Sequence, residues 1–124
     1  MDLIHVNLAV ADVERSVAFY PEQLRFKQTL GFEADGTVHR YVSADNGVEL
    51  QLSESGETGG DTIDHVDGLQ HLAAGVDDVD TAFDRIDHHG VIKEPGDQPA
   101  AGARTAFVLD PDGYTVELVE PLDE

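Results

Sequence analysis

Apolar and polar residues alternate along one short segment near the start of each half of the chain. In residues 3–10 every second residue is apolar, and residues 69–76 repeat the alternation. A period of two is typical of a β-strand that is buried on one face. Asp12 and Asp78 follow these segments, and each precedes apolar residues at helical spacing. We therefore expect each half to begin with a strand and then a helix whose N-terminus is capped by Asp.

The ends of the two helices are predicted from Pro and Gly. Pro21 is expected to interrupt the first helix, and Gly31 is expected to cap the C-terminus of its helical part. Gly90 is expected to stop the second helix. A short strand would then begin at Val91, followed by a loop rich in Pro, Gly and Ala at residues 95–102.

Each half also carries a turn sequence between two strand-like segments. Residues 110–113 read Asp-Pro-Asp-Gly, in which Pro presets φ at the second position and Gly accommodates a positive φ. In the first half, the Asn-Gly pair at 46–47 signals a hairpin between predicted strands at 38–43 and 48–52. On the strand that leaves the second turn, Glu117 is expected to point away from the apolar face.

The two halves resemble each other in sequence. Residues within His5–Val13 recur within His71–Val79 at a constant offset of 66, and the Val-Glu-Leu segment at 48–50 recurs at 116–118 with an offset of 68. Recurrence of this kind indicates a tandem duplication, here of a β-α-β-β(-β) unit. On this alignment the Glu of each Val-Glu-Leu segment is the counterpart of the other.

The chain is therefore predicted to be a single α+β domain made of two modules, at about residues 1–53 and 68–120. Between them, residues 53–67 are rich in Gly, Ser, Asp and Glu and show little periodicity, as expected for a connector. With 124 residues, of which 40% are hydrophobic, the chain is long enough to bury a core.

Charge and composition narrow the classes of function. The net charge is −19, from 26 acidic and 7 basic residues, which disfavours nucleic acid and anionic membranes as partners. The acidic residues are dispersed, as on the surface of a protein from a salt-accumulating halophile, where salt screens their repulsion. No apolar run could span a bilayer and no signal peptide is recognised, so we expect a cytoplasmic protein. The absence of Cys excludes thiolate nucleophiles and thiolate metal ligands.

Four polar residues on predicted strands are the candidates for chemistry: His5, Glu49, His71 and Glu117. A single His or Glu on a strand is more often a solvated or satisfied side chain than a ligand, but one His and one Glu recur in each half. If the halves pair around a pseudo-twofold axis, the four side chains would meet. Two imidazoles and two carboxylates suit Zn, Ni, Co, Mn or Fe, whereas Mg and Ca prefer more oxygen ligands.

The segment Phe-Val-Leu-Asp-Pro-Asp-Gly-Tyr-Thr-Val-Glu-Leu-Val-Glu at 107–120, together with the strand that carries His5, resembles the vicinal-oxygen-chelate superfamily. Within it the chain is most similar to the metal-dependent glyoxalase I (lactoylglutathione lyase) type. The resemblance implies tandem βαβββ modules that form a curved mixed sheet around a metal site. It also implies a homodimer, in which each site combines His5 and Glu49 of one chain with His71 and Glu117 of the other.

By the same resemblance, His5, Glu49, His71 and Glu117 would bind one divalent ion, with Ni or Zn preferred and Co, Mn or Fe as alternatives. The implied reaction converts the thiohemiacetal of a 2-oxoaldehyde of the methylglyoxal type into a 2-hydroxyacyl thioester through a metal-bound enediolate. Glu117 would act as the base and Glu49 as the matching carboxylate. Such an enzyme would remove methylglyoxal from the cell.

The chain departs from the glyoxalase I pattern at Ala9, where an Arg that holds a carboxylate of glutathione is usual. Arg104 and Arg40 are the candidate substrate-binding residues in its place, and the thiol stays open. Two alternatives stay open as well. One is another metalloenzyme of the superfamily, namely an extradiol dioxygenase or a thiol transferase, and the other is a metal-free binding protein of the resistance type.

Overall fold

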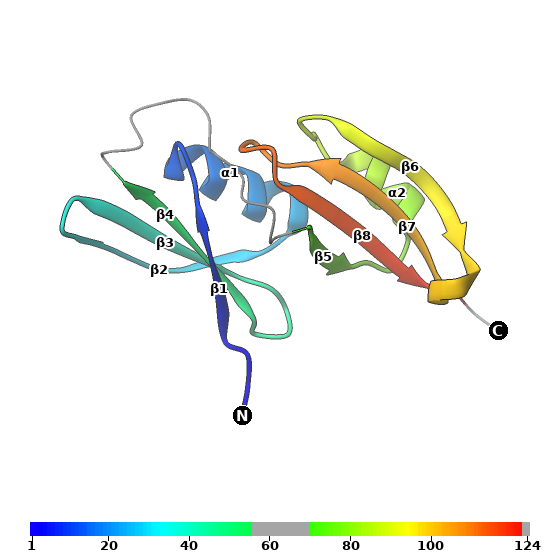
Figure 1. Ribbon diagram of the computed structural model, residues 1–124, viewed down its shortest axis with the longest axis horizontal. Coiled ribbons are helices and arrows are strands. Elements are labelled where there is room, and N and C mark those ends of the chain that lie inside the picture. Colours follow the sequence, from blue (N-terminus) through cyan, green and yellow to red (C-terminus); the bar gives the residue numbers. More distant parts are fainter. Residues whose placement is uncertain (56–69, 123–124) are drawn as a thin grey trace. The chain divides into compact units, whose positions relative to one another are not determined.

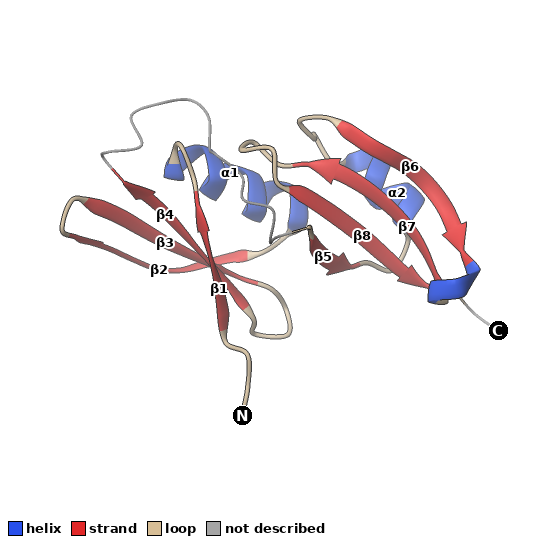
Figure 2. Cartoon of the chain, in the orientation of Figure 1, coloured by secondary structure: helices blue, strands red, loops and turns tan. Residues whose placement is uncertain are grey.

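The computed structural model describes residues 1–55 and 70–122 of the chain. The chain divides into two compact units, Met1–Asp64 and His65–Glu124. Within these described ranges, each unit contains one four-stranded mixed sheet and one α-helix, coloured by type in Figure 2. The predicted connector at 53–67 lies mostly outside the described residues, and so does the start of the strand predicted at 69–76.

Unit 1 has the order of elements β1(His5–Ala9), α1(Val13–Leu24), β2(Lys27–Ala34), β3(Thr37–Ser43) and β4(Glu49–Ser55). The strands lie in the order β1-β4-β3-β2 within the sheet (Figure 1). β1 pairs with β4 in parallel, and the remaining pairs are antiparallel. This arrangement is a βαβββ module, as predicted.

Unit 2 repeats the arrangement with β5(Leu72–Gly75), α2(Val79–Arg85), β6(Val91–Gln98), the 3₁₀ turn η1(Pro99–Ala101), β7(Ala103–Leu109) and β8(Thr115–Pro121). Its sheet order is β5-β8-β7-β6, with β5 parallel to β8. The predicted α+β class with tandem βαβββ modules is therefore confirmed. No helix in the described parts of the chain is long and apolar enough to cross a membrane.

The two helices begin in the same way. Asp12 accepts hydrogen bonds from the backbone of the first turn of α1, and Asp78 accepts one from Thr81 N at 3.1 Å. A carboxylate from the neighbouring sheet adds a second acceptor: Glu54 Oε1 lies 2.7 Å from the first N–H of α1, and Glu120 Oε1 lies 2.9 Å from that of α2. These carboxylates satisfy N–H groups that a helix leaves unpaired at its N-terminus, and they tie each helix to its sheet.

The predicted C-terminus of the first helix is wrong. α1 runs through Pro21 to Leu24, and Arg25 ends it in the left-handed region with a φ of 62°. Gly31 is not a cap, because it lies inside strand β2. Pro21 removes only one hydrogen bond, near the end of the helix, and the last turn closes through Arg25 N–H to Tyr20 O. Strand β2 was not predicted because all of its residues are exposed. Burial of one face therefore imposes no alternation of apolar and polar residues on its sequence.

The predicted boundaries in the second half also shift. α2 ends at Arg85 rather than at Gly90. The expected loop at 95–102 is instead the end of strand β6 followed by η1. Pro95 is tolerated because β6 is an edge strand and its pairing with β7 shifts between Lys93 and Gly96.

Both predicted hairpin turns are confirmed. Gly47 has a φ of 90° and donates to Ala44 O at 3.0 Å, and Gly113 has a φ of 84° and donates to Asp110 O at 3.0 Å. In the second turn Asp110 Oδ1 also accepts from the backbone of Asp112 at 2.9 Å. Glycine is required at both positions because other residues rarely adopt this backbone conformation.

Candidate functional site

Each sheet has one face that packs on its own helix and a second face that we call the ligand face. In unit 1 the side chains of Val42, Leu50 and Leu52 are buried on the helix side. Tyr41 and Gln51 alternate with them along β3 and β4 and so lie on the ligand face.

In unit 2 the buried residues Val108, Val116 and Leu118 occupy the helix side. Phe107 and Glu117, which are opposite each other in the pairing of β7 with β8, lie on the ligand face. The predicted orientation of Glu117, away from the apolar face, is therefore what the structure shows.

The internal repeat has one constant offset. The pair Val6 and Leu50 of β1 and β4 corresponds to the pair Leu72 and Val116 of β5 and β8, and both partners lie 66 residues later. The same offset relates the pairing of β3 with β4 to that of β7 with β8. It also relates the hydrogen bonds of the two turns and the two carboxylates that bind the helix N-termini.

The counterpart of Glu117 is therefore Gln51, and the counterpart of Glu49 is Thr115. The offset of 68 that matched the two Val-Glu-Leu segments is wrong. Similar tripeptides led to it, but the register of a hairpin is set by its turn, and Gly47 and Gly113 hold equivalent places in the two turns.

In unit 2 the structure brings His71 and Glu117 together. His71 Nε2 lies 3.1 Å from Glu117 Oε1, although His71 precedes β5 and Glu117 is in the middle of β8. The His71 side chain is 40% exposed and that of Glu117 is 18% exposed. The His71 ring also meets Phe107 edge-on, with centroids 5.6 Å apart. Unit 2 thus presents one imidazole and one carboxylate at a single place on its ligand face.

In unit 1 the equivalent place holds His5 and Gln51. The His5 ring meets Tyr41 edge-on with centroids 5.7 Å apart, as His71 meets Phe107. Gln51 Nε2 lies 3.1 Å from His39 Nδ1. This contact requires His39 Nδ1 to accept, so the amide nitrogen of Gln51 is occupied as a donor.

The hydrogen bonds continue from His39 along the ligand face of unit 1. Ser53 Oγ lies 2.7 Å from His39 Nδ1 and accepts from Asn7 Nδ2 at 2.9 Å. The ring of Phe32 of β2 stacks on that of His39, with the two ring centroids 4.6 Å apart. The region is therefore a network of hydrogen-bonded side chains without a carboxylate, beside aromatic rings, in contrast to the histidine–carboxylate pair of unit 2.

Glu49 lies on the same face as Gln51, two residues before it on β4. It is opposite His5 in the pairing of β1 with β4, and its Oε2 accepts a hydrogen bond from the Thr29 hydroxyl of β2. Each unit thus supplies half of the predicted ligand set. In the described residues, no group of three His, Asp or Glu side chains is close enough to hold a metal ion.

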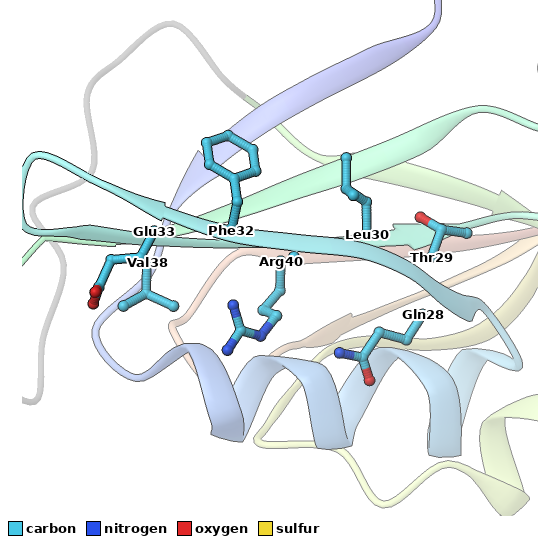
Figure 3. A pocket seen from close by; sticks show the side chains of 8 residues that line it. Gln28, Thr29, Leu30, Phe32, Glu33, Val38 and Arg40 are labelled. Carbon is cyan, nitrogen blue, oxygen red and sulfur yellow. The ribbon is translucent and has the colours of Figure 1, made fainter.

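Neither candidate substrate-binding arginine lies on a ligand face. Arg40 precedes Tyr41 on β3 and points toward α1, and Figure 3 shows it on the opposite side of the sheet from Phe32 and Leu30. Its Nη2 lies 3.9 Å from Glu14 Oε1 of α1.

Arg104 precedes Thr105 on β7 and faces α2. Its Nε and Nη2 bind the two carboxylate oxygens of Asp80 at 2.8 and 3.0 Å, and its Nη1 binds Asp97 at 3.0 Å. The hydrogen bond from Arg104 lowers the pKa of the Asp80 carboxyl below its usual value, and the two carboxylates raise the pKa of Arg104. Strand alternation explains both placements, because a residue next to one on the ligand face points to the helix.

The basic side chains on the ligand faces belong to two lysines, Lys27 and Lys93. Lys27 pairs with Ser43, which lies on the ligand face of unit 1 with Tyr41, and Lys93 pairs with Phe107 in unit 2. Both lysines are exposed. Sequence reasoning did not single out Lys27, because β2 was not predicted as a strand.

Known proteins resemble the chain over nearly its full length. The sequence profile of the Glyoxalase/Bleomycin resistance protein/Dioxygenase superfamily matches residues 2–118. Lactoylglutathione lyase of Salmonella typhimurium is 33% identical over 130 residues, which cover 99% of this chain and 95% of that protein.

Solved structures agree with the sequence comparison. Trypanothione-dependent glyoxalase I of Leishmania major superposes with a TM-score of 0.79 at 28% identity, covering 97% of this chain and 86% of that one. Glyoxalase I from Zea mays superposes with a TM-score of 0.85 at 24% identity, covering 98% of this chain and 45% of that one. At this identity the maize structure supports the fold alone.

Proposed function

The chain belongs to the glyoxalase/bleomycin resistance protein/dioxygenase superfamily, and we propose that it is a metal-dependent lyase of the glyoxalase I type. The observation that carries the proposal is the pair His71 and Glu117, which meet at 3.1 Å on the ligand face of unit 2. His5 stands at the equivalent place of unit 1 and contacts the equivalent ring. Identity of 33% to a lactoylglutathione lyase supports the same conclusion.

The residues proposed to hold a divalent ion are His5, His71 and Glu117, with a fourth ligand from β4. The donors fit a borderline ion such as Ni²⁺ or Zn²⁺, because imidazole nitrogen and carboxylate oxygen are ligands that these ions accept. The two imidazoles hold corresponding positions in the repeat, 66 residues apart, which supports the proposal that one ion binds both. When bound, the ion would act as a Lewis acid on the vicinal oxygens of the substrate.

Glu117 is proposed as the group that moves the proton. Its carboxylate would take the proton from the carbon that bears sulfur and hydroxyl in the thiohemiacetal and return it to the adjacent carbonyl carbon, while the hydroxyl proton passes to the oxygen of that carbonyl. A carboxylate suits this task because it accepts and releases a proton without a change of position. The side chain is only 18% exposed, and its partner His71 is in contact with it, so the carboxylate is held in place.

The anionic end of the thiol would be held by a lysine. Ala9 lies on the ligand face of β1, opposite Ser53, and offers no charge to a carboxylate. Arg40 and Arg104 face the helices, as described above. Lys93 is in register with Phe107, which in turn is in register with Glu117, so its ammonium group is the cation we propose for this role.

The test combines metal analysis with turnover. We expect protein purified in high salt to contain about one equivalent of a divalent metal and to isomerise the adducts of methylglyoxal with a small thiol. Relatives are named for glutathione and for trypanothione, so a panel of thiols is required. Full metal content with no turnover of any thiol adduct would contradict the proposal.

A second function has one observation in its favour. The place on β4 that corresponds to Glu117 holds the neutral Gln51. If Gln51 does not bind the ion, His5, His71 and Glu117 would form the two-histidine, one-carboxylate set of non-haem iron oxygenases, which leaves positions on the iron open. Oxygen uptake with iron and a catechol would support this alternative. The identity to lactoylglutathione lyases over the whole chain favours the lyase.

A further inference from the structure

We propose that the fourth metal ligand in this protein is Gln51 and not Glu49. The bound ion would then be held by two imidazoles, one carboxylate and one amide oxygen. This inference rests on the proposed function, because it concerns a ligand of the same metal site. It departs from the ligand set that the sequence predicted.

The register of the sheets carries the proposal. In unit 2 the strand pairing places Ala73 opposite Glu117, so His71 reaches Glu117 diagonally across two residues of β5. The same pairing in unit 1 places Asn7 opposite Gln51, and His5 stands two residues before Asn7. The diagonal neighbour of His5 is therefore Gln51, whereas Glu49 is directly opposite His5.

The ring contacts identify the same position. Phe107 is opposite Glu117 in the pairing of β7 with β8 and meets His71 edge-on. Tyr41 is opposite Gln51 in the pairing of β3 with β4 and meets His5 edge-on. Each unit thus contains the same group of three residues: a histidine, an aromatic residue and the residue opposite that aromatic residue. The last of these is Glu117 in unit 2 and Gln51 in unit 1.

The hydrogen bonding of Gln51 leaves its amide oxygen as the atom that could bind a cation. Its Nε2 is engaged by His39 Nδ1 at 3.1 Å, and His39 is in turn hydrogen-bonded to Ser53. With the nitrogen fixed, the amide oxygen is the atom that a cation would bind, and an amide nitrogen is not a metal ligand at neutral pH. A side chain that is already oriented by a neighbouring histidine costs less entropy to order around an ion.

Glu49 has a different environment. Its carboxylate is hydrogen-bonded to the Thr29 hydroxyl of the edge strand β2 and lies in the row of Ser43 and Lys27. The equivalent position of unit 2 is Thr115, which carries no charge. Unit 2 therefore brings its histidine and carboxylate together without a carboxylate at the position that corresponds to Glu49.

The assignment changes the chemistry of the site. With one carboxylate ligand a divalent ion keeps a net charge of about +1, whereas two carboxylates would neutralise it. A more positive ion is the stronger Lewis acid, and it partly offsets the repulsion of an anionic substrate by a protein with a net charge of −19. Glu117 is then the only carboxylate at the ion, so it alone moves the proton.

Metal titration of four forms of the full-length protein in high salt tests the proposal. The forms are the wild type, Gln51→Leu, the matched control Glu49→Leu and the gain-of-charge variant Gln51→Glu, each checked for its fold by circular dichroism. The readouts are the Ni²⁺ affinity by calorimetry and the visible absorption spectrum of bound Co²⁺. Neither readout depends on turnover.

We expect Gln51→Leu to weaken Ni²⁺ binding by at least about tenfold and to change the Co²⁺ spectrum, since even residues behind the ligands contribute about this much. Glu49→Leu should leave both readouts unchanged, and Gln51→Glu should bind more tightly than the wild type. Loss of affinity in Glu49→Leu with wild-type affinity in Gln51→Leu would overturn this inference and leave the proposed lyase intact. A wild type that binds no divalent ion would overturn both.

Discussion

The two units share one topology and one register, yet their ligand faces differ at one equivalent position, which holds Glu117 in unit 2 and Gln51 in unit 1. Unit 2 pairs a histidine directly with the carboxylate of Glu117. Unit 1 places the amide of Gln51 at the equivalent position and connects it to His39 and Ser53. The comparison teaches that a duplicated fold can hold the same arrangement of histidine, aromatic ring and third side chain in both copies while only one copy has a carboxylate as the third side chain.

Removing the carboxylate of unit 2 should have the largest effect. We expect Glu117→Gln to lower kcat by about 100- to 10,000-fold, the usual contribution of a general base. The fold should be retained, because Glu117 lies on the ligand face and not in the core. Steady-state turnover of the best thiol adduct measures kcat, and circular dichroism checks that the fold is retained. Wild-type turnover in this variant would show that the base is assigned to the wrong residue.

A second change on the same background sharpens the comparison. If the two positions are equivalent, adding Gln51→Glu to Glu117→Gln moves the carboxylate from unit 2 to unit 1 and should restore part of the lost turnover. The matched control is Glu49→Gln on the same Glu117→Gln background, which should restore none. Equal turnover of both double variants would argue against the equivalence of Gln51 and Glu117.

The lysines of the two edge strands should have a smaller effect. Lys93 stands in the row of Phe107 and Glu117, whereas Lys27 stands in the row of Glu49. We expect Lys93→Gln to raise KM for an anionic thiol adduct by about two- to fivefold with kcat little changed, as the loss of one exposed ion pair predicts. Lys27→Gln is the control and should raise KM less. The difference should shrink as salt is added, because exposed charges are screened.

The smallest expected effect concerns the arginines that face the helices. Arg104 binds Asp80 through two hydrogen bonds, whereas Arg40 and Glu14 are 3.9 Å apart. Arg104→Gln should therefore lower Tm more than Arg40→Gln at neutral pH. The folded state lowers the pKa of Asp80, so this stabilisation is present above the ordinary pKa of 3.8 and is lost as the pH falls through the lowered value.

The stabilisation by the Arg104–Asp80 pair is checked by measuring Tm for the wild type and both variants between neutral and acidic pH. The Tm difference between the wild type and Arg104→Gln should narrow as the pH falls below about 4, where the unfolded carboxyl is protonated. A difference that stays constant across this range would show that Asp80 does not contribute through its charge.

Several elements could be predicted from the sequence because their signals are local. Asp12 and Asp78 cap helices where expected, and Gly47 and Gly113 occupy the turns where expected. These residues act on their own backbone or on the next few residues, so no tertiary contact is needed to recognise them. Strand β2 could not be predicted, because an edge strand with every residue exposed has no burial pattern to read.

The sequence by itself determined the duplication, the α+β class and the presence of His5 and Glu117 on strands, and it placed His71 on a strand that begins one residue later, at Leu72. Only the tertiary structure decided which residue of β4 corresponds to Glu117 in the repeat, because two similar Val-Glu-Leu segments suggested a register that the turns do not allow. A register depends on hydrogen bonds between strands that are distant in the chain, and a shift of two residues keeps every side chain on the same face. The periodicity of the sequence therefore cannot distinguish Glu49 from Gln51, whereas the strand pairing does.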